Sequence, residues 1–216
     1  MGDRAILVTG FEPFGGETIN ASWEATRALD RWRCGDFVAH AVILPVAYEA
    51  CVADFVAAFE RLQPAAVLMT GQAARRGLVS VERYAHNRAR AVNADSRGVV
   101  LGAATRSEAE RLEANAPVRG VARGIWAAGV PTRVSIDAGD YVCNHLYFGA
   151  LNFLAGSALG APAVFVHLPA TPEQTLERAN VRRLPTADAA RALQAAASVL
   201  AQAVPRLISP LEEAAQ

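Results

Sequence analysis

The sequence predicts a single α/β domain in which helices cover both faces of a central, mostly parallel twisted sheet. Short apolar runs rich in β-branched residues alternate along the chain with longer segments of helical period, which is the pattern of parallel strands joined by helices. The chain has 216 residues, of which 52% are hydrophobic, so it is long enough to bury one large core. No internal repeat or linker divides it, and residues 1–216 are expected to form one domain.

Five apolar runs are expected to form strands because each is short, rich in β-branched residues and bounded by polar residues, glycine or proline. They span residues 5–11, 37–46, 65–71, 131–138 and 162–169. A further segment within residues 77–87 alternates apolar and polar residues and includes Glu82. This alternation predicts one more strand.

Segments of helical period lie between the strands. Residues 48–62 place Cys51, Phe55 and Phe59 on one face, which predicts a helix with Cys51 in the core. The last helix is expected to start at Thr186 as its N-cap, and the chain from about residue 205 is expected to be a loose tail. This last helix is expected to end at residue 204. The other helices are expected over residues 22–32 and 118–129, and from just before Cys143 to about Leu154.

Residues 87–105 show no clear period and are rich in small, polar and arginine residues. A long loop of this kind in a compact domain is either a mobile lid or disordered, and the sequence leaves both alternatives open. The arginines of this region are expected on a solvated surface or in the loop itself; they are Arg75, Arg76, Arg83, Arg88 and Arg90.

The composition excludes several functions. The chain has no lysine, so it offers neither a Schiff base to a pyridoxal cofactor nor a phosphate-loop lysine. Its formal net charge of zero disfavours nucleic acid and acidic membranes as partners. Three scattered cysteines, no apolar signal region and no apolar run of about 18 residues favour a cytoplasmic location. We therefore expect a small partner molecule.

Polar residues follow the apolar runs at four places. Phe11 and a glycine-rich turn follow the first run, Gln72 follows the third, Cys143 lies shortly after the fourth, and His167 lies near the end of the fifth. Ligands of open parallel sheets bind outside the carboxyl ends of the strands. The four strand ends are therefore expected to line one crevice.

Cys143 is a candidate nucleophile because it is predicted to lie in the first turn of a helix. Free backbone N–H groups and the helix dipole stabilise an anion there, which lowers the pKa of a thiol from about 8.5. The same N–H groups can stabilise a tetrahedral oxyanion. Two alternatives remain: Cys143 is a small buried apolar residue, or it binds a metal with His145, for which no further ligands at zinc-like spacing are found.

A thiol nucleophile needs a base, and His167 is the strongest candidate because it ends a run predicted to be buried. The sequence leaves open whether it is a base or a core histidine. His145 lies two residues from Cys143, points to another side of the helix and is expected to be held by nearby backbone. Glu82 either orients an imidazole or is an exposed carboxylate that pairs with Arg76 or Arg83.

The chain resembles the pyroglutamyl peptidase I family, also called pyrrolidone carboxyl peptidases. The matching segments run in the family's order from about residue 5 to residue 180. They are TGFEPFGGETIN followed by SWEA, GQA followed by VERYAHN, DAGDYVCNHLYFG, and VFVHLPATPEQT.

The resemblance implies a cysteine peptidase that removes an N-terminal pyroglutamyl residue from peptides through a thioester, without metal or organic cofactor. It places the nucleophile at Cys143, the base at His167 and the carboxylate at Glu82. It places the pocket for the lactam ring at Phe11, Phe14, Asn20, Gln72, Tyr141 and Val142. The family often forms dimers or tetramers, so a homodimer or homotetramer is expected by analogy.

The chain departs from the family pattern around the predicted loop. Ala74 and Arg75 replace paired glycines, and Val81 replaces a proline. The arginine of a family motif falls on Val92, so its role in orienting the substrate is expected to pass to Arg90 or Arg88. Tyr141 stands where phenylalanine is usual. These changes leave two alternatives: a related cysteine amidase with another small acyl substrate, and a catalytically inactive protein that retains the ring pocket.

Overall fold

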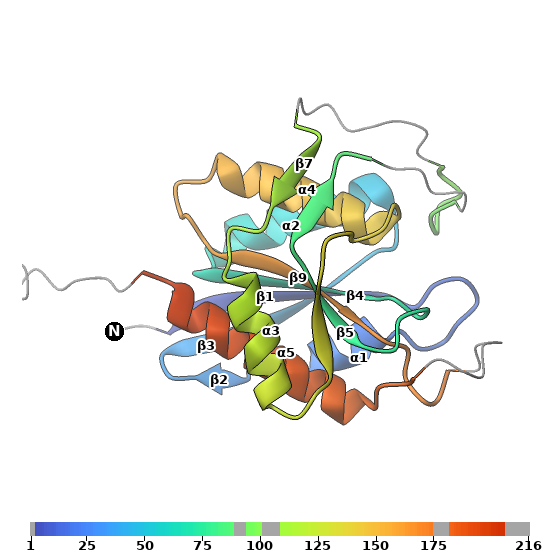
Figure 1. Ribbon diagram of the computed structural model, residues 1–216. Coiled ribbons are helices and arrows are strands. Elements are labelled where there is room, and N and C mark those ends of the chain that lie inside the picture. The colour runs from blue at the N-terminus through green and yellow to red at the C-terminus, as the bar shows by residue number, and fades with distance from the viewer. Residues whose placement is uncertain (1–2, 89–93, 101–108, 175–181, 206–216) are drawn as a thin grey trace, which may run out of the picture.

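The computed structural model describes residues 3–88, 94–100, 109–174 and 182–205 (Figure 1). In this part of the chain, a seven-stranded sheet forms the centre of the molecule. In spatial order its strands are β2 (Arg33–Cys34), β3 (Phe37–Leu44), β1 (Arg4–Phe11), β4 (Ala66–Gln72), β9 (Ala163–Leu168), β5 (Val79–Glu82) and β8 (Thr132–Ser135). All neighbours pair in parallel except β2 with β3 and β5 with β9. The predicted fold class is confirmed.

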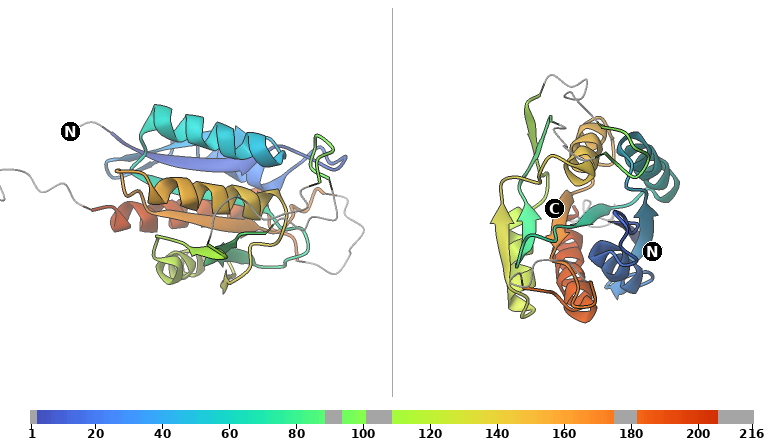
Figure 2. Two further views of the ribbon diagram at one scale, coloured as in Figure 1. Left: turned by 90° about the horizontal axis from the view of Figure 1, so that it is seen from above. Right: turned by 90° about the vertical axis from the view of Figure 1, so that its right-hand side faces the viewer.

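Helices cover both faces of this sheet (Figure 2). One layer consists of α2 (Tyr48–Leu62) and α4 (Val142–Ala155), and the other of α1 (Ala21–Ala28), α3 (Val118–Ala127) and α5 (Thr186–Ala203). Successive strand residues point to opposite faces, so Leu7 and Met69 pack under α2 and α4, whereas Val8 and Leu68 pack under the other layer. The strands β1, β4 and β9 therefore carry apolar residues on both sides.

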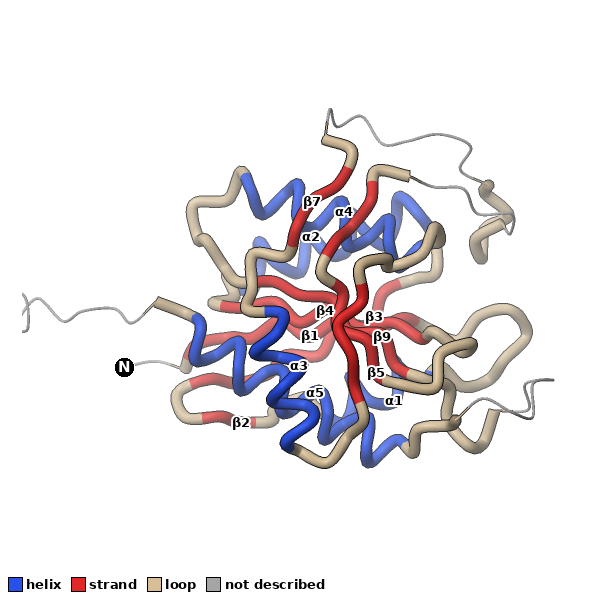
Figure 3. The backbone as a smooth tube through the Cα atoms, in the orientation of Figure 1, coloured by secondary structure: helices blue, strands red, loops and turns tan. Residues whose placement is uncertain are grey.

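A separate two-stranded ribbon was not predicted. It pairs β6 (Tyr84–His86) with β7 (Arg111–Glu113) in antiparallel register and lies beside α4 (Figure 3). Three-residue strands are too short to show a period. The first strand of the ribbon follows directly after β5. The segment that was predicted to be a long loop lies between β6 and β7 in the sequence.

Two predicted boundaries are wrong. Thr186 is the first helical residue of α5 and not its cap, because the N-cap position belongs to Pro185, whose carbonyl accepts from the N–H groups of Asp188 and Ala189, both at 2.9 Å. The helix expected to reach residue 32 ends at Ala28, and Arg31 takes a left-handed conformation with φ 63°. The helix over residues 48–62 is confirmed, with Cys51 fully buried.

The described part of the predicted loop is attached to the start of α2. Asp95 is 7% exposed, and its carboxylate accepts from the N–H groups of Tyr48, Arg97 and Val99 at 2.8–3.0 Å. Tyr48 is the first residue of α2, whose own N-cap position has no side-chain hydrogen bond. One carboxylate therefore caps α2 and closes the turn over residues 95–99.

Gly10 provides a test of how closely α1 packs on β1. A Cβ atom at Gly10 would lie 2.5 Å from the backbone oxygen of Ser22 and 2.6 Å from Oγ1 of Thr26. Since backbone must shift to make room, Gly10→Ala should lower the free energy of unfolding by about 1–3 kcal/mol, measured by urea denaturation. The control is Gly156→Ala, where the nearest atom would be 3.7 Å away. Equal stability of the two variants would contradict the close packing.

Candidate active site

His167 and Glu82 form a buried hydrogen-bonded pair on the sheet. Nδ1 of His167 lies 2.8 Å from Oε1 of Glu82, and the two residues are 4% and 0% exposed. This bond leaves Nε2 of the imidazole as the nitrogen that can exchange a proton with another group. The alternative of an exposed Glu82 is wrong.

The strand register explains why these two side chains meet. In the antiparallel pair of β5 and β9, Glu82 lies opposite Phe165 and Ser80 lies opposite His167. Residues directly opposite one another point to the same face, as do residues two apart on one strand. Glu82, Phe165 and His167 therefore all face the layer of α2 and α4.

Cys143 lies on the same face of the sheet, at the start of α4. It is the second residue of α4, and a Cβ atom on Gly71 would lie 2.7 Å from its Sγ and 2.9 Å from Cζ of Phe165. Gly71 is the register partner of His167 in the pairing of β4 with β9. The thiol thus rests on the sheet beside His167, in space that only a glycine leaves open.

The thiol and the imidazole are not yet hydrogen bonded. In the described part of the chain, Sγ of Cys143 makes no hydrogen bond to His167. Contacts between a nucleophile and its base are often long before substrate binds and tighten with it.

The surroundings of the half-buried Cys143 favour its thiol over the thiolate. Burial, helped by the negative charge of Glu82, raises the pKa of Cys143 to about 12. The expectation of a lowered pKa is therefore wrong. Removing the thiolate from water costs more free energy than the helix N-terminus and Arg76 contribute by stabilising its charge. Burial also lowers the pKa of His167, although Glu82 opposes this shift. Both shifts favour a neutral thiol beside a neutral imidazole.

Arg76 completes the charge arrangement; the sequence analysis considered it as a partner of Glu82 only for an exposed carboxylate. Its Nη1 contacts Oε1 of Glu82, and its Nη2 donates to the backbone oxygen of Asp137 at 2.7 Å. Burial alone would raise the pKa of Glu82, but His167 and Arg76 hold it below its usual range. Glu82 is thus a buried carboxylate with a positive partner on one side and an imidazole on the other.

Two residues of α4 attach the helix to the neighbouring strands. Asn144 is fully buried, accepts from the N–H of His86 at 2.9 Å and donates to the carbonyls of His86 and Arg88. The hydroxyl of Tyr147 donates to the backbone oxygen of Glu82 at 3.0 Å. Asn144 thereby fixes the start of α4, next to Cys143, against the end of β6. Its position between Cys143 and His145 was the sequence signal for this role.

Three of the predicted ring-pocket residues lie near the nucleophile. Tyr141 is the N-cap residue of α4 and Val142 its first residue, and the ring of Phe14 lies 6.2 Å from that of Tyr141 between centroids. The hydroxyl of Tyr141 donates to the backbone oxygen of Ala94 at 3.0 Å, which ties this pocket wall to the turn that Asp95 closes. Phe14 and Tyr141 provide two half-buried aromatic faces.

The other predicted pocket residues hold the start of α1. Asn20 caps this helix by accepting from Ser22, and its amide donates to the backbone oxygen of Glu12 at 2.9 Å. The side chain of Gln72 accepts from the N–H of Ala21 at 2.7 Å. Phe11 is 2% exposed. These residues thus fix the glycine-rich turn that leads to Phe14.

The remaining candidates are His145 and the arginines Arg88 and Arg90, and their surroundings differ. His145 packs edge-on against Tyr48 at 5.3 Å between centroids, and its Nδ1 has no hydrogen-bond partner among the described residues, so the expected backbone bond is not found there. Arg88 pairs with the carboxylate of Asp137 at 2.5 Å. Arg90 and Val92 lie outside the described residues.

Neither a metal site nor a membrane span is found in the part of the chain that the structure describes. No group of three or more histidine, cysteine, aspartate and glutamate residues is placed to hold a metal ion there. No helix there is both long and apolar enough to cross a membrane.

An α/β sheet with a thiol, an imidazole and a carboxylate on one face defines the class of cysteine hydrolases. Comparison with known proteins specifies the family. The family model described as pyroglutamyl peptidase matches residues 4–203, and the chain belongs to this family. The resemblance stated from its motifs is confirmed.

Relatives and solved structures agree with this assignment. The pyrrolidone-carboxylate peptidase of Cupriavidus pinatubonensis is 42% identical over 79% of this chain and 81% of its own length. That of Gloeobacter violaceus is 35% identical over 90% and 96%. The crystal structure of Bacillus amyloliquefaciens pyroglutamyl peptidase I superposes with a TM-score of 0.88 at 30% identity, covering 93% of this chain and 98% of that chain.

The raised pKa of Cys143 predicts how the free thiol reacts. Only the thiolate is alkylated, so the rate of Cys143 labelling by iodoacetamide should be low at pH 7 and should keep rising between pH 6 and pH 9.5 without a plateau. Mass spectrometry of the labelled peptide measures this rate, and Cys143→Ala gives the background from Cys34 and Cys51. A plateau below about pH 8.5 would show a preformed thiolate and contradict the neutral pair.

Proposed function

We propose that this protein hydrolyses the amide bond that follows an N-terminal pyroglutamyl residue of a peptide. Cys143 acts as nucleophile, His167 as base and Glu82 as the group that orients the imidazole. The observation that supports these roles is the Glu82–His167 bond of 2.8 Å on the sheet face on which Cys143 rests. The substrate follows from the family to which the chain belongs.

Acylation begins from the neutral pair. Nε2 of His167 takes the thiol proton while Sγ of Cys143 forms a bond to the pyroglutamyl carbonyl carbon. The oxyanion accepts from backbone N–H groups in the first turn of α4, where no side chain caps the helix. His167 then gives its proton to the leaving amine, the C–N bond breaks, and a thioester remains.

Deacylation uses the same base. His167 removes a proton from water as the water oxygen bonds to the thioester carbon. The C–S bond breaks, the proton returns to the sulfur, and pyroglutamic acid leaves. In both halves an imidazolium forms beside Glu82, whose pKa lies below its usual range. The carboxylate therefore stays ionised and stabilises the charge when it appears.

The pocket residues suit a flat lactam. Phe14 and Tyr141 offer aromatic faces to the ring. Gln72, whose side-chain oxygen is held by α1, offers its N–H groups to the ring carbonyl. Asn20 is buried and bonded to Glu12 and Ser22, so it supports the pocket by fixing the turn that contains Phe14. Phe11 and Val142 form the buried support of this pocket. We assign Arg90 the role of the missing family arginine.

The proposed reaction uses no metal or organic cofactor. We infer a cytoplasmic location, and assembly into a homodimer or homotetramer by analogy with the family. The substrates are peptides whose N-terminal residue is already cyclised to pyroglutamate.

The activity is tested with chromogenic amides of pyroglutamate, alanine and proline. We expect hydrolysis of the pyroglutamyl amide alone, and a loss of at least about a thousandfold in kcat/KM for Cys143→Ala. Cys34→Ala is the matched control, because Cys34 lies on β2 at the far edge of the sheet, and it should keep full activity. Faster turnover of the other amides would indicate a related amidase, and no turnover an inactive binding protein.

Arg76 should set the acid side of the pH profile. Its charge lowers the pKa of His167, and the reaction needs His167 neutral. Arg76→Met removes that charge, so the pKa of His167 should rise and the acid limb of kcat/KM should move to higher pH. Arg76→Lys keeps the charge and should restore part of the original profile. An acid limb that stays in place in Arg76→Met would show that Arg76 has only a structural role.

A further inference from the structure

The edge strand β8 has a hollow on each of its two faces. It pairs with β5, and in the described part of the chain no strand pairs with its other edge. An unpaired edge presents backbone N–H and C=O groups that can bind another extended chain. The hollows beside this edge and the charges around it indicate which kind of peptide it binds.

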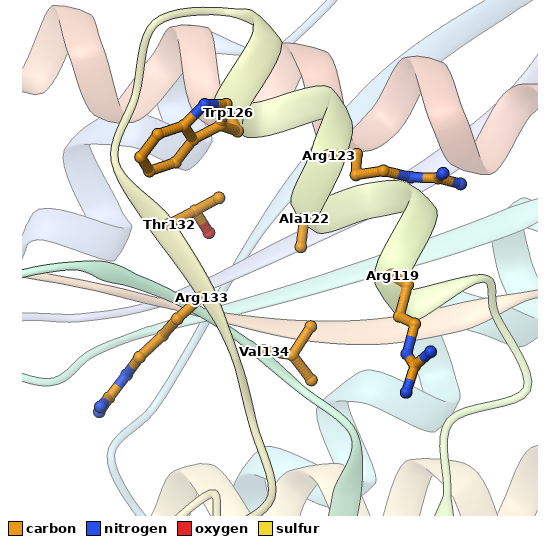
Figure 4. A pocket seen from close by; sticks show the side chains of 7 residues that line it. All are labelled: Arg119, Ala122, Arg123, Trp126, Thr132, Arg133 and Val134. Atoms are coloured by element: carbon orange, nitrogen blue, oxygen red, sulfur yellow. The ribbon is translucent and has the colours of Figure 1, made fainter.

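The first hollow lies between β8 and α3 and has a volume of about 620 Å³. Figure 4 shows Trp126 at one end and Ala122 and Val134 between the helix and the strand, with Arg119 and Arg123 extending from α3. Trp126 is 64% exposed, which is unusual for so large an apolar side chain. Exposed tryptophan and arginine side chains around an apolar centre are typical of binding surfaces.

The second hollow lies at the other end of β8, next to the candidate active site. Its volume is about 350 Å³, and its lining includes Arg76, Arg133, Asp137 and Gly139. Arg133 points away from α3 in Figure 4. Because Arg76 contacts Glu82, this hollow begins directly behind the catalytic carboxylate.

A strand added to β8 would use both hollows. Successive side chains of an extended peptide point to opposite faces, so alternate residues would enter the groove beside Trp126 and the hollow beside Arg133. Main-chain bonds to the free edge would provide affinity and the hollows would select side chains, as in other cases of strand addition.

The charge of this surface favours an acidic peptide. Asp137 is the one carboxylate among the residues that line the two hollows, and it is already paired with Arg88. Arg119, Arg123 and Arg133 form no ion pair within the described residues. A second copy of the chain would bring the same positive groups against them, so self-association through this face is disfavoured.

We propose that the edge of β8 binds the downstream part of the peptide substrate as an added acidic strand, antiparallel to β8. The inference rests on the proposed function. An enzyme that removes the first residue leaves all the remaining substrate on the leaving-group side, so an extended subsite lies only there. The chain runs from the end of β8 at Ser135 to Cys143 within eight residues, which brings this end of the edge toward the nucleophile. Substrates with acidic residues downstream are thus selected.

The test compares three pyroglutamyl substrates: a short chromogenic amide, a peptide of about ten residues in which Glu and Val alternate, and its Lys and Val counterpart. Strand addition to a four-residue edge needs about this length. We expect the acidic peptide to exceed the basic one at least tenfold in kcat/KM, with a smaller ratio at high salt.

The variant Arg119→Glu/Arg123→Glu should abolish or reverse this preference and leave turnover of the short amide unchanged, which also confirms that it folds. Arg61→Glu is the matched control, since Arg61 is exposed on α2 in the other helix layer, and it should keep the preference. An acidic peptide N-methylated at alternate residues should lose its advantage if main-chain bonds to the edge are used.

The possible failures are distinguishable. If wild-type protein does not hydrolyse the short amide, the proposed function fails and the inference with it. If the short amide is hydrolysed but acidic and basic peptides are equal, the function stands and the subsite is overturned. Equal peptides together with dimerisation that the double variant abolishes, measured by analytical ultracentrifugation, would assign the surface to a second copy of the chain.

Discussion

The burial of one ionised carboxylate determines the arrangement of the site. Glu82 is fully buried, and an isolated charge in such a place costs several kcal/mol. The cost is offset by the imidazole of His167 and the guanidinium of Arg76, which meet the same oxygen, Oε1. Because β5 runs opposite to β9, its last residue lies level with Phe165 and within reach of His167. The reversal of β5 relative to β9 thus has a chemical consequence.

The same burial decides how the nucleophile is controlled. A helix N-terminus favours a thiolate, but the sheet, Phe165 and the charge of Glu82 surround Cys143 and favour the thiol. A protonated sulfur is also protected from oxidation and from unspecific electrophiles, because those reactions need the thiolate. The surroundings of Cys143 therefore favour a thiol of low intrinsic reactivity.

Much of the fold could be predicted from the sequence, since periodicity is a local property. The strands and the helix over residues 48–62 follow from it, and polar residues at strand ends indicate where His167 and Cys143 lie. Strand direction is not encoded in that pattern, so the reversal of β5 and of its parallel neighbour β8 was not predicted. The expectation that the end of the run over residues 131–138 meets the ends of three other strands at one edge is wrong, because β8 runs the opposite way to β1, β4 and β9. The contact of Arg76 with Glu82 depends on how the turn between β4 and β5 folds, and the pKa of Cys143 depends on distant residues that bury it.

The carboxylate of Asp95 joins the first turn of α2 to the turn over residues 95–99. Burial alone would raise the pKa of Asp95, but the N–H groups of Val99, Tyr48 and Arg97 hold it below its ordinary value. The turn closed by this carboxylate also receives the hydroxyl of Tyr141 at Ala94. Protonation of Asp95 in acid weakens the cap of α2 and the turn that holds the Tyr141 hydroxyl together. One carboxylate therefore couples the acid stability of the first turn of a core helix to that of the turn over residues 95–99.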